Sequence, residues 1–324
     1  MFTNPPLDLA IVLVTWNVRE LALDAIRTVR ADLAESGLGG AIWVVDNASA
    51  DGTAEAIQHT FPDVHLIASE RNLGFAAGNN LALRALGFAD TPTPAPQAPR
   101  AVFLLNPDTR TEQGALQALY EALFTLPRAG IVGARLAYED GAFQHSAFRF
   151  PGLAQLFIDL YPLPNRLRAR LYETPLNGRY PRRRYETGSP FAVDHTLGAT
   201  MLFRREAIEA TGLFDEGYFM YVEEVDWSMR VQRAGWAIYT VPSARITHLE
   251  GRSTRQVRAQ SIVNLWRSRL KFYDRYYPRW KRAAARLLVR GGMRLKIRAV
   301  RREGSLPPEV REALIAAYRE VIAL

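Results

Sequence analysis

Three carboxylates stand within four residues late in the chain, at the start of a stretch with helical periodicity. They are Glu223, Glu224 and Asp226, and they follow the aromatic segment 218–221. Mutual repulsion and apolar neighbours raise the pKa of a carboxyl group, which suits it to general-base catalysis. Negative charge at a helix N-terminus is the structural alternative. Because residues three apart share a helix face, Glu223 and Asp226 are expected together and Glu224 elsewhere, so one face can be structural and the other catalytic.

Small polar side chains follow two apolar, strand-like segments. Segment 9–14 runs into Thr15 and Asn17, and segment 41–45 runs into Asp46 and Asn47. An acid at a strand end can accept hydrogen bonds from a base or a ribose, although the sequence 47–52 is also typical of a turn and a helix cap. We expect the two strand ends to present these side chains together.

A third polar segment, residues 70–80, reads Glu-Arg-Asn-Leu-Gly-Phe-Ala-Ala-Gly-Asn-Asn and predicts a loop running into a helix. Gly74 and Gly78 permit close backbone approach, and the helix N-terminus offers N–H groups to an anion. No Gly-Lys-Ser/Thr follows, so this is not a Walker loop. The pattern is not Gly-x-Gly-x-x-Gly either, which argues against a nicotinamide dinucleotide site.

Asp108 is the first candidate for a metal ligand. It follows the apolar segment 101–105 in the sequence Asn-Pro-Asp-Thr, where a carboxylate suits Mg²⁺ or Mn²⁺ bridging two phosphates. The alternative is an N-cap for a helix expected around 111–126. His248, one of five histidines, follows the apolar segment 244–247. It is either a second ligand of the same metal or a structural histidine.

The elements that must position these residues follow from the alternation of apolar and helical patterns. Strands are expected at Leu9–Thr15, Ala41–Asp46, Val64–Ala68, Ala101–Leu105 and Gly130–Ala134, with helices between them. This order predicts an α/β fold with a mainly parallel sheet flanked by helices. Ligands then bind at the carboxyl edge of the strands. The proline-rich segment 88–100 is expected to lie on the surface. The irregular segment 161–190 is either a mobile loop near a substrate or a solvated loop.

Composition narrows the possible functions. The 324 residues include no cysteine, which excludes disulfides, zinc ribbons, iron–sulfur clusters and thiol nucleophiles. The N-terminus does not read as a signal peptide, and no segment approaches the roughly 20 apolar residues of a membrane-spanning helix. We therefore expect a cytoplasmic protein.

The net charge of +8 is concentrated near the C-terminus. Residues 267–302 carry 14 basic residues and one acid, Asp274, and arginines recur every four residues from Arg282 to Arg298. Such a helical segment can bind anionic lipid at the inner face of the cell membrane. A solvated or oligomer-forming helix is the alternative, and nucleic acid is not expected because no recognition motif is present. Gly291 and Gly292 are a point at which this helix can break.

Taken in chain order, these segments resemble the inverting family 2 glycosyltransferases, in particular the rhamnosyltransferase-like bacterial branch. The match extends from about residue 10 to residue 253. The motifs that carry it are Val14-Thr-Trp-Asn17, Val45-Asp-Asn-Ala-Ser-Ala-Asp-Gly-Thr53, Asn72-Leu-Gly-Phe-Ala-Ala-Gly-Asn-Asn80, Leu105-Asn-Pro-Asp-Thr109, Gly198-Ala-Thr-Met-Leu-Phe-Arg-Arg-Glu-Ala207 and Phe214-Asp-Glu-Gly-Tyr-Phe-Met-Tyr221 with Glu223-Glu-Val-Asp226. The resemblance implies a GT-A (nucleotide-diphospho-sugar transferase) fold, a sugar-nucleotide donor and Mg²⁺ or Mn²⁺.

The resemblance also implies roles for individual residues. The donor-binding set is Thr15, Asn17, Asp46, Asn47, Asn72, Gly74, Gly78, Asn79, Asn80 and Asp108. Asp108 and His248 would hold the metal on the diphosphate. The family pattern Glu-Asp-x-Asp corresponds here to Glu223, Glu224 and Asp226, so that Glu replaces the first Asp. Either Glu224 or Glu223 would then be the base, and Glu224 is favoured.

These inferences define the expected function. A glycosyltransferase domain over residues 1–255 precedes a basic helical extension over residues 256–324. The enzyme is expected to move a sugar from a dTDP-, UDP- or GDP-sugar to a polysaccharide or lipid-linked glycan during cell-wall or polysaccharide synthesis. The resemblance implies dTDP-rhamnose as the leading donor and rhamnose as the transferred sugar. The alternative is a non-catalytic scaffold of the same fold that binds a sugar nucleotide or glycan; a nucleotidyltransferase or a dehydrogenase does not explain the cluster at 223–226.

Overall fold

The computed structural model describes residues 6–249, 258–303 and 305–324, and these residues form two compact units. The first unit comprises residues 6–148, 180–219 and 223–249. The second comprises residues 149–179, 220–222, 258–303 and 305–324. The domain boundary expected between residues 255 and 256 lies outside the described residues.

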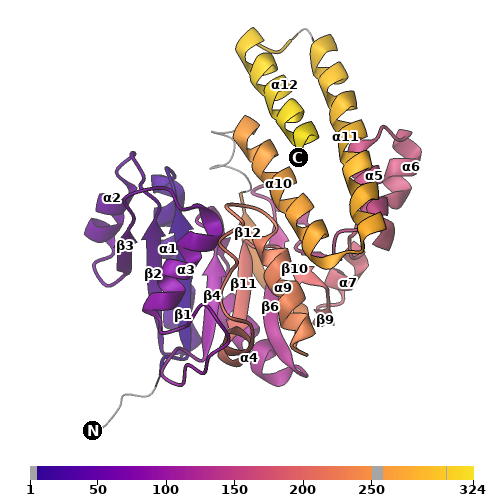
Figure 1. Ribbon diagram of the computed structural model, residues 1–324. Helices are drawn as coiled ribbons and strands as arrows, with labels where there is room; N and C mark the ends of the chain where they lie inside the picture. Colours follow the sequence, from indigo (N-terminus) through magenta and orange to yellow (C-terminus); the bar gives the residue numbers. More distant parts are fainter. Residues whose placement is uncertain (1–5, 250–257, 304) are drawn as a thin grey trace. The chain divides into compact units, whose positions relative to one another are not determined.

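The first unit is built on a mixed, mainly parallel sheet with the strand order β3-β2-β1-β4-β11-β6-β12-β5 (Figure 1). Its strands are β1 (Leu9–Thr15), β2 (Gly40–Asp46), β3 (His65–Ala68), β4 (Ala101–Leu105), β5 (Thr109–Thr111), β6 (Ala129–Ala137), β7 (Phe143–Gln144), β9 (Phe191–Ala192), β11 (Thr200–Arg204) and β12 (Ala237–His248). Strands β8 (Ala147–Phe148) and β10 (His195–Thr196) pair separately. Strand β1 runs parallel to β2 and β4, and β12 runs parallel to β6.

All five strands expected from the sequence are present, and β1 and β4 have the expected bounds. The sequence did not predict that β11 inserts antiparallel between β4 and β6. The parallel arrangement of β1, β2 and β4 brings their carboxyl ends to one edge. This confirms the α/β fold, and it brings together the strand ends at which the sequence predicts a ligand site.

Helices cover both faces of this sheet. The helices are α1 (Arg19–Ser36), α2 (Thr53–Thr60), α3 (Gly74–Ala85), α4 (Ala115–Thr125), α7 (Arg182–Glu186), α8 (Arg205–Thr211) and α9 (Glu223–Arg233). Leu9, Ile11 and Leu13 belong to the core under α1 and α4, whereas Ala10 and Val12 belong to the core with α3 and α9. Successive side chains of a strand point to opposite faces, so burial on both sides accounts for the unbroken apolar sequence of β1.

The start of α4 differs from the sequence expectation. The short strand β5 pairs with β12 directly after Asp108, so the helix begins only at Ala115 and Asp108 does not cap it. Asp32 of α1 does so instead, because its carboxylate accepts hydrogen bonds from the backbone N–H groups of Gly114 (2.6 Å) and Leu116 (2.8 Å). Burial is the largest influence on the pKa of Asp32 and raises it, while these two hydrogen bonds act in the opposite direction.

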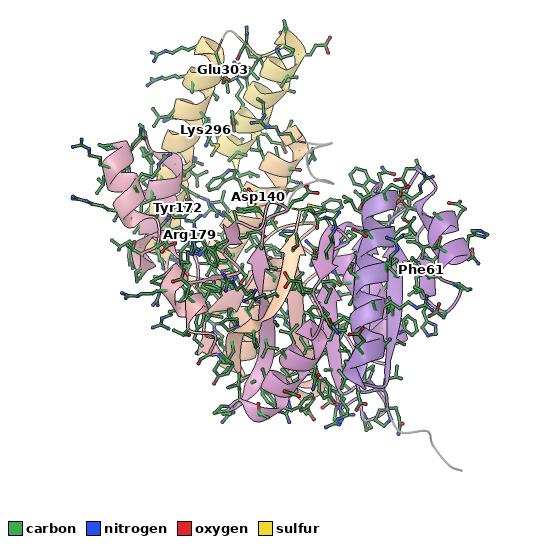
Figure 2. All side chains as sticks on the ribbon, turned by 180° about the vertical axis from the view of Figure 1, so that it is seen from behind. Phe61, Asp140, Tyr172, Arg179, Lys296 and Glu303 are labelled. Carbon is green, nitrogen blue, oxygen red and sulfur yellow. The ribbon has the colours of Figure 1, made fainter. Side chains whose placement is uncertain are left out.

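The second unit is helical. Its elements are α5 (Leu153–Leu160), α6 (Asn165–Leu171), a 3₁₀ turn η1 (Pro175–Asn177), α10 (Arg258–Tyr276), α11 (Arg279–Arg302) and α12 (Pro308–Ala323) (Figure 1). Trp266, Met293 and Val321 pack in its core. The guanidinium of Arg179 lies 4.4 Å from the ring centre of Tyr172 (Figure 2). This cation–π contact stabilises the segment after α6.

Helix α11 continues through Gly291 and Gly292, so the break considered in the sequence does not occur. The two glycines instead allow close packing of α5. A side chain on Gly291 would overlap the Tyr161 hydroxyl, which donates a hydrogen bond to the Leu288 carbonyl (3.1 Å). A side chain on Gly292 would lie 2.7 Å from Cβ of Leu160. None of the helices in the described part of the chain combines the length and hydropathy that a bilayer crossing requires.

Replacing the capping carboxylate should destabilise the first unit. We expect Asp32→Asn to lower the free energy of unfolding by about 1–3 kcal/mol, because an amide offers one acceptor oxygen to two buried N–H donors. Chemical denaturation measures this change. Glu20→Gln on the same helix, where the exposed side chain pairs only with exposed Arg19, is the control and should be close to neutral. Equal stability of the two variants would contradict the capping role.

Candidate functional site

A row of buried polar atoms follows the carboxyl ends of β1, β2 and β4. Within the described residues, five such side-chain atoms have no hydrogen-bond partner: Oγ1 of Thr15, Oδ1 of Asp46, Oδ1 of Asn47, Oδ1 of Asn106 and Oδ1 of Asp108. Strand register places Thr15 directly beside Asp46. Buried polar groups in proteins are nearly always hydrogen-bonded, so a row of unsatisfied acceptors at a sheet edge indicates a site for a polar ligand.

The loops after β1 and β2 are tied together. The backbone N–H of Asn17 donates to Oγ of Ser49 (2.9 Å), and its side-chain Oδ1 accepts from the N–H of Ala50 (2.7 Å). Oδ2 of Asp46 accepts from the N–H of Ser49 (2.9 Å). Asn17 and Ala48 have left-handed φ angles of 51° and 59°, which concentrate backbone strain here. The side chain of Asn17 thus shapes the loop, while Asp46 keeps one oxygen toward the site.

The next loop is held by a backbone approach that only glycine permits. Gly74 has φ +80°, and a side chain there would overlap the carbonyl oxygen of Phe219. That carbonyl accepts a hydrogen bond from the N–H of Phe75 (2.9 Å). Oδ1 of Asn72 accepts from the N–H of Gly74 (2.9 Å). The side-chain amide of Asn47 donates to the carbonyl of Gly74 (3.0 Å). Asn72 and Asn47 therefore fix the start of α3.

The other candidate residues of this motif, Gly78, Asn79 and Asn80, are buried in α3. A side chain on Gly78 would lie 2.8 Å from Cγ1 of Val14. The amide of Asn79 donates to the Phe75 carbonyl (2.9 Å). The amide of Asn80 donates to the carbonyl of Phe214 (3.0 Å) and accepts from its N–H (3.1 Å). In this structure Asn79 and Asn80 hold backbone segments in place around the site.

Asp108 and His248 are brought together by the pairing of β5 with β12. Both are buried, and Nε2 of His248 lies 3.4 Å from Oδ1 of Asp108 without making a hydrogen bond. Nδ1 of His248 lies 3.3 Å from Oε1 of Gln144, an acceptor for its proton. With the proton on Nδ1, Nε2 turns its lone pair toward a carboxylate oxygen.

In that tautomer, Nε2 of His248 and Oδ1 of Asp108 are two electron-rich atoms that face each other and fit a bound cation. Oxygen and imidazole nitrogen are suitable ligands for Mn²⁺, and a hydrogen bond to the far nitrogen is the usual way in which proteins orient a histidine ligand. Within residues 6–249, 258–303 and 305–324, no group of three or more acidic or histidine side chains is placed so that it could hold a metal ion. Asp108 and His248 would therefore supply two ligands, and ligand oxygens or water would supply the others.

The carboxylates of α9 fall on different sides of the helix. Glu223 and Asp226 are buried, whereas Glu224 is half-buried. Oδ2 of Asp226 accepts from Nε of Arg230 (3.0 Å), and the same guanidinium donates to the carbonyls of Thr211 (2.7 Å) and Leu213 (2.8 Å). Asp226 thus anchors the helix through a hydrogen-bonded ion pair.

Glu224 lies in a different environment. Its Cβ and Cγ are each 3.5 Å from the point at which a side chain on Gly198 would begin, so the absent side chain leaves room beside the carboxylate. Tyr221 and Val222, directly before the helix, have φ angles of 70° and 71°. This conformation is an outlier for a β-branched residue, and such strain tends to cluster at functional sites.

Two residues of this site were not singled out from the sequence. Asn106 lies in the same strand-end motif as Asp108, and that proximity was a usable signal. Gln144 gave no usable signal, because it reaches His248 only through the two-residue strand β7, which pairs with β6.

A cavity of about 510 Å³ lies elsewhere in the first unit and is lined by Arg135, Tyr185 and Arg245 among others. None of the predicted site residues lines it.

Comparison with known proteins finds relatives over most of the chain. Residues 10–212 match the family described as Glycosyl transferase family 2. The chain is 32% identical over 257 residues to the N-acetylglucosaminyl-diphospho-decaprenol L-rhamnosyltransferase of Mycobacterium tuberculosis, covering 79% of this chain and 81% of that protein. It is 25% identical over 228 residues to the low-salt glycan biosynthesis hexosyltransferase Agl10 of Haloferax volcanii, covering 70% and 62% of the two chains.

Solved structures show the same fold. The mannosyltransferase PcManGT from Pyrobaculum calidifontis, in complex with GDP-Man and Mn²⁺, superposes with a TM-score of 0.55 at 16% identity, covering 98% of this chain and 86% of that one. GalNAc-T7 with UDP, GalNAc and Mn²⁺ gives a TM-score of 0.56 at 15% identity, covering 99% and 57%. At this level of identity the likeness establishes the GT-A architecture alone.

The contact between Gly74 and Phe219 can be tested against a matched glycine. Gly87, just beyond the end of α3, also has a positive φ of 93° but has open space around it. Gly87→Ala should cost about 1–2 kcal/mol of unfolding free energy from the backbone conformation alone. Gly74→Ala should cost about 1–3 kcal/mol more, because overlap with the Phe219 carbonyl is added. Denaturation curves measure both, and equal losses would rule out the steric requirement.

The hydrogen bond to His248 should tune the affinity for metal. Gln144→Leu removes the acceptor for Nδ1–H, so we expect the dissociation constant for Mn²⁺ to rise by about ten- to a hundredfold, measured by the electron paramagnetic resonance signal of free Mn²⁺. Gln144→Glu keeps an acceptor and should retain most of the affinity. If Gln144→Leu binds Mn²⁺ as tightly as the unsubstituted protein, Gln144 does not orient a metal ligand.

Proposed function

This chain belongs to glycosyl transferase family 2, and we propose that it moves L-rhamnose from a nucleotide-diphosphate donor to a hydroxyl of a lipid-linked glycan. The observation that carries the proposal is the row of unsatisfied buried acceptors at the ends of β1, β2 and β4, beside Asp108 and His248. The choice of sugar and acceptor rests on the rhamnosyltransferase that is 32% identical over most of both chains.

The donor nucleotide would bind at the strand-end row. Asp46 and Thr15 lie side by side with one unsatisfied oxygen each, which suits hydrogen bonds to a base and a ribose. The loops bearing Asn17 and Asn72 would form the walls of this pocket. We propose dTDP-rhamnose as the donor, with UDP- and GDP-sugars as the alternatives to be compared with it.

Asp108 and His248 would hold Mg²⁺ or Mn²⁺ at the diphosphate. Their buried oxygen and nitrogen atoms fit such an ion, which when bound stabilises the negative charge that develops on the leaving diphosphate. Gln144 would keep Nε2 of His248 available by accepting the proton on Nδ1. The protein thereby prepares the ligand geometry in advance, with the strand pairing of β5 and β12 fixing the separation of the two side chains.

Glu224 would act as the general base. It is half-buried, so it can meet both solvent and substrate, and Gly198 places no side chain against its carboxylate. The carboxylate would take the proton of the acceptor hydroxyl as that oxygen bonds to the anomeric carbon and the carbon–oxygen bond to the diphosphate breaks. Attack from the opposite face inverts the configuration without a covalent enzyme intermediate. Glu223 is the alternative base, whereas the ion pair of Asp226 with Arg230 suits it to a positioning role.

A non-catalytic scaffold is the second candidate, because Glu stands where the family pattern has its first Asp. The two candidates differ in turnover and agree in donor binding. A calorimetric comparison of dTDP-, UDP- and GDP-sugars, with and without Mn²⁺, would identify the nucleotide. Slow hydrolysis of the bound donor, lost in Asp108→Ala, would favour the enzyme; binding with no turnover in the presence of acceptor would favour the scaffold.

Glu224→Gln should abolish transfer while preserving the donor site. We expect the turnover number to fall by about 10²–10⁴-fold, since the amide cannot accept the proton, with the donor dissociation constant nearly unchanged. Turnover is measured as transfer of rhamnose to a diphosphate-linked N-acetylglucosaminyl lipid, and binding is measured by calorimetry. Glu223→Gln is the matched variant. The reverse pattern, with Glu223→Gln inactive and Glu224→Gln active, would move the base to Glu223.

A further inference from the structure

The long helix α11 has one continuous exposed face that combines large apolar side chains with arginines. Its residues recur every three or four positions: Trp280, Ala283, Leu287, Arg290, Arg294, Arg298 and Arg301. At about 100° per residue, they occupy roughly a quarter of the helix circumference. Ala285, Val289 and Met293 on the opposite side are buried in the core of the second unit. The exposed stripe is therefore separate from the packing of the unit.

The N-terminal half of this stripe is apolar. Trp280 is 68% exposed and Leu287 is 69% exposed, the two highest values among the large apolar side chains that the structure describes. They lie two helical turns apart, with exposed Ala283 between them. Apolar side chains gathered on one exposed face mark a contact surface, and tryptophan in particular favours the boundary between a membrane and water.

The C-terminal half of the stripe is basic. Arg290, Arg294, Arg298 and Arg301 have no carboxylate within ion-pair distance in the described part of the chain. The helix itself contains no acidic residue, and Glu303 follows its last turn, beyond Lys296 (Figure 2). On another side of the helix, by contrast, Arg286 pairs with Asp274 at 2.7 Å. Four free guanidinium groups in a row suit a surface that bears phosphates.

We propose that this face of α11 binds an anionic phospholipid surface. Trp280 and Leu287 would enter the headgroup region, and the arginines would contact the lipid phosphates. A second copy of the same face would place its four arginines against the same four arginines in parallel pairing, or against the apolar half in antiparallel pairing. Neither arrangement supplies a negative charge, which disfavours self-association. Nucleic acid would satisfy the charges and could stack on Trp280, but it gives Leu287 no partner. The proposal does not depend on the transfer reaction, because its readout is binding to vesicles.

The test uses the full chain and vesicles of phosphatidylcholine with or without phosphatidylglycerol. We expect binding only to the anionic vesicles, weakened by salt. Replacing Arg290, Arg294 and Arg298 together by Gln should lower the partition coefficient by about a hundredfold. Trp280→Ser with Leu287→Ser should lower it by at least about tenfold. The matched control replaces Arg166, Arg168 and Arg170 of α6, which are equally exposed, by Gln and removes the same charge.

The outcomes separate a defined membrane face from general electrostatics. Strong loss in both α11 variants with little loss in the α6 variant supports the proposal. Equal loss in the two triple-arginine variants means that net charge alone sets the binding and overturns it. Absence of vesicle binding, or tight binding to single-stranded RNA that Leu287→Ser leaves unchanged, also overturns it. Unchanged unfolding midpoints and donor binding show that the variants remain folded.

Discussion

The contact of the α3 N-terminus with the backbone of Phe219 is the constraint on which the site depends. The N–H of Phe75 donates to the Phe219 carbonyl, and Gly74 leaves the space that this carbonyl fills. On the same helix, Asn80 holds the backbone of Phe214 from both sides. Segments separated by more than 130 residues are thereby fixed to the loop that begins α3. Helix α3 also packs on β1 through Gly78 and Val14. The same helix therefore positions both the strand-end acceptors and the segment 214–219.

A second constraint is electrostatic and lies in α9. Asp226 is fully buried, and a buried carboxylate is costly unless it is paired and hydrogen-bonded. Arg230 supplies the pair, and its two terminal nitrogens donate to the carbonyls of Thr211 and Leu213, so that the ion pair also fixes the loop before Phe214. Removing either partner would leave the other charge unpaired. The pair therefore locks the orientation of α9, and with it the direction in which Glu224 projects.

The sequence predicted the sheet well because β1 and β4 are buried on both faces, which produces unbroken apolar segments. It also predicted the separation of Glu224 from Glu223 and Asp226, since helical spacing alone determines faces. It could not predict the antiparallel insertion of β11, which depends on tertiary pairing, or the contact of Gln144 with His248, which depends on a two-residue strand. Gly291 and Gly292 were ambiguous because a glycine pair serves a helix break and a close helix contact equally well. The roles assigned to individual site residues remain predictions.

The buried polar residues of the candidate site have two kinds of role, and burial alone does not distinguish them. Asn80 and Asp46 are both buried and both polar. The oxygen and nitrogen of Asn80 are used by the backbone of Phe214, whereas Asp46 keeps one oxygen without a partner. A side chain whose donor and acceptor groups are already bonded to the protein has less capacity left for a ligand, so it shapes the site. Thr15, Asp46, Asn106 and Asp108 retain unused acceptors at adjacent strand ends. In the proposed function they would contact the donor, while Asn80 would shape the site around it.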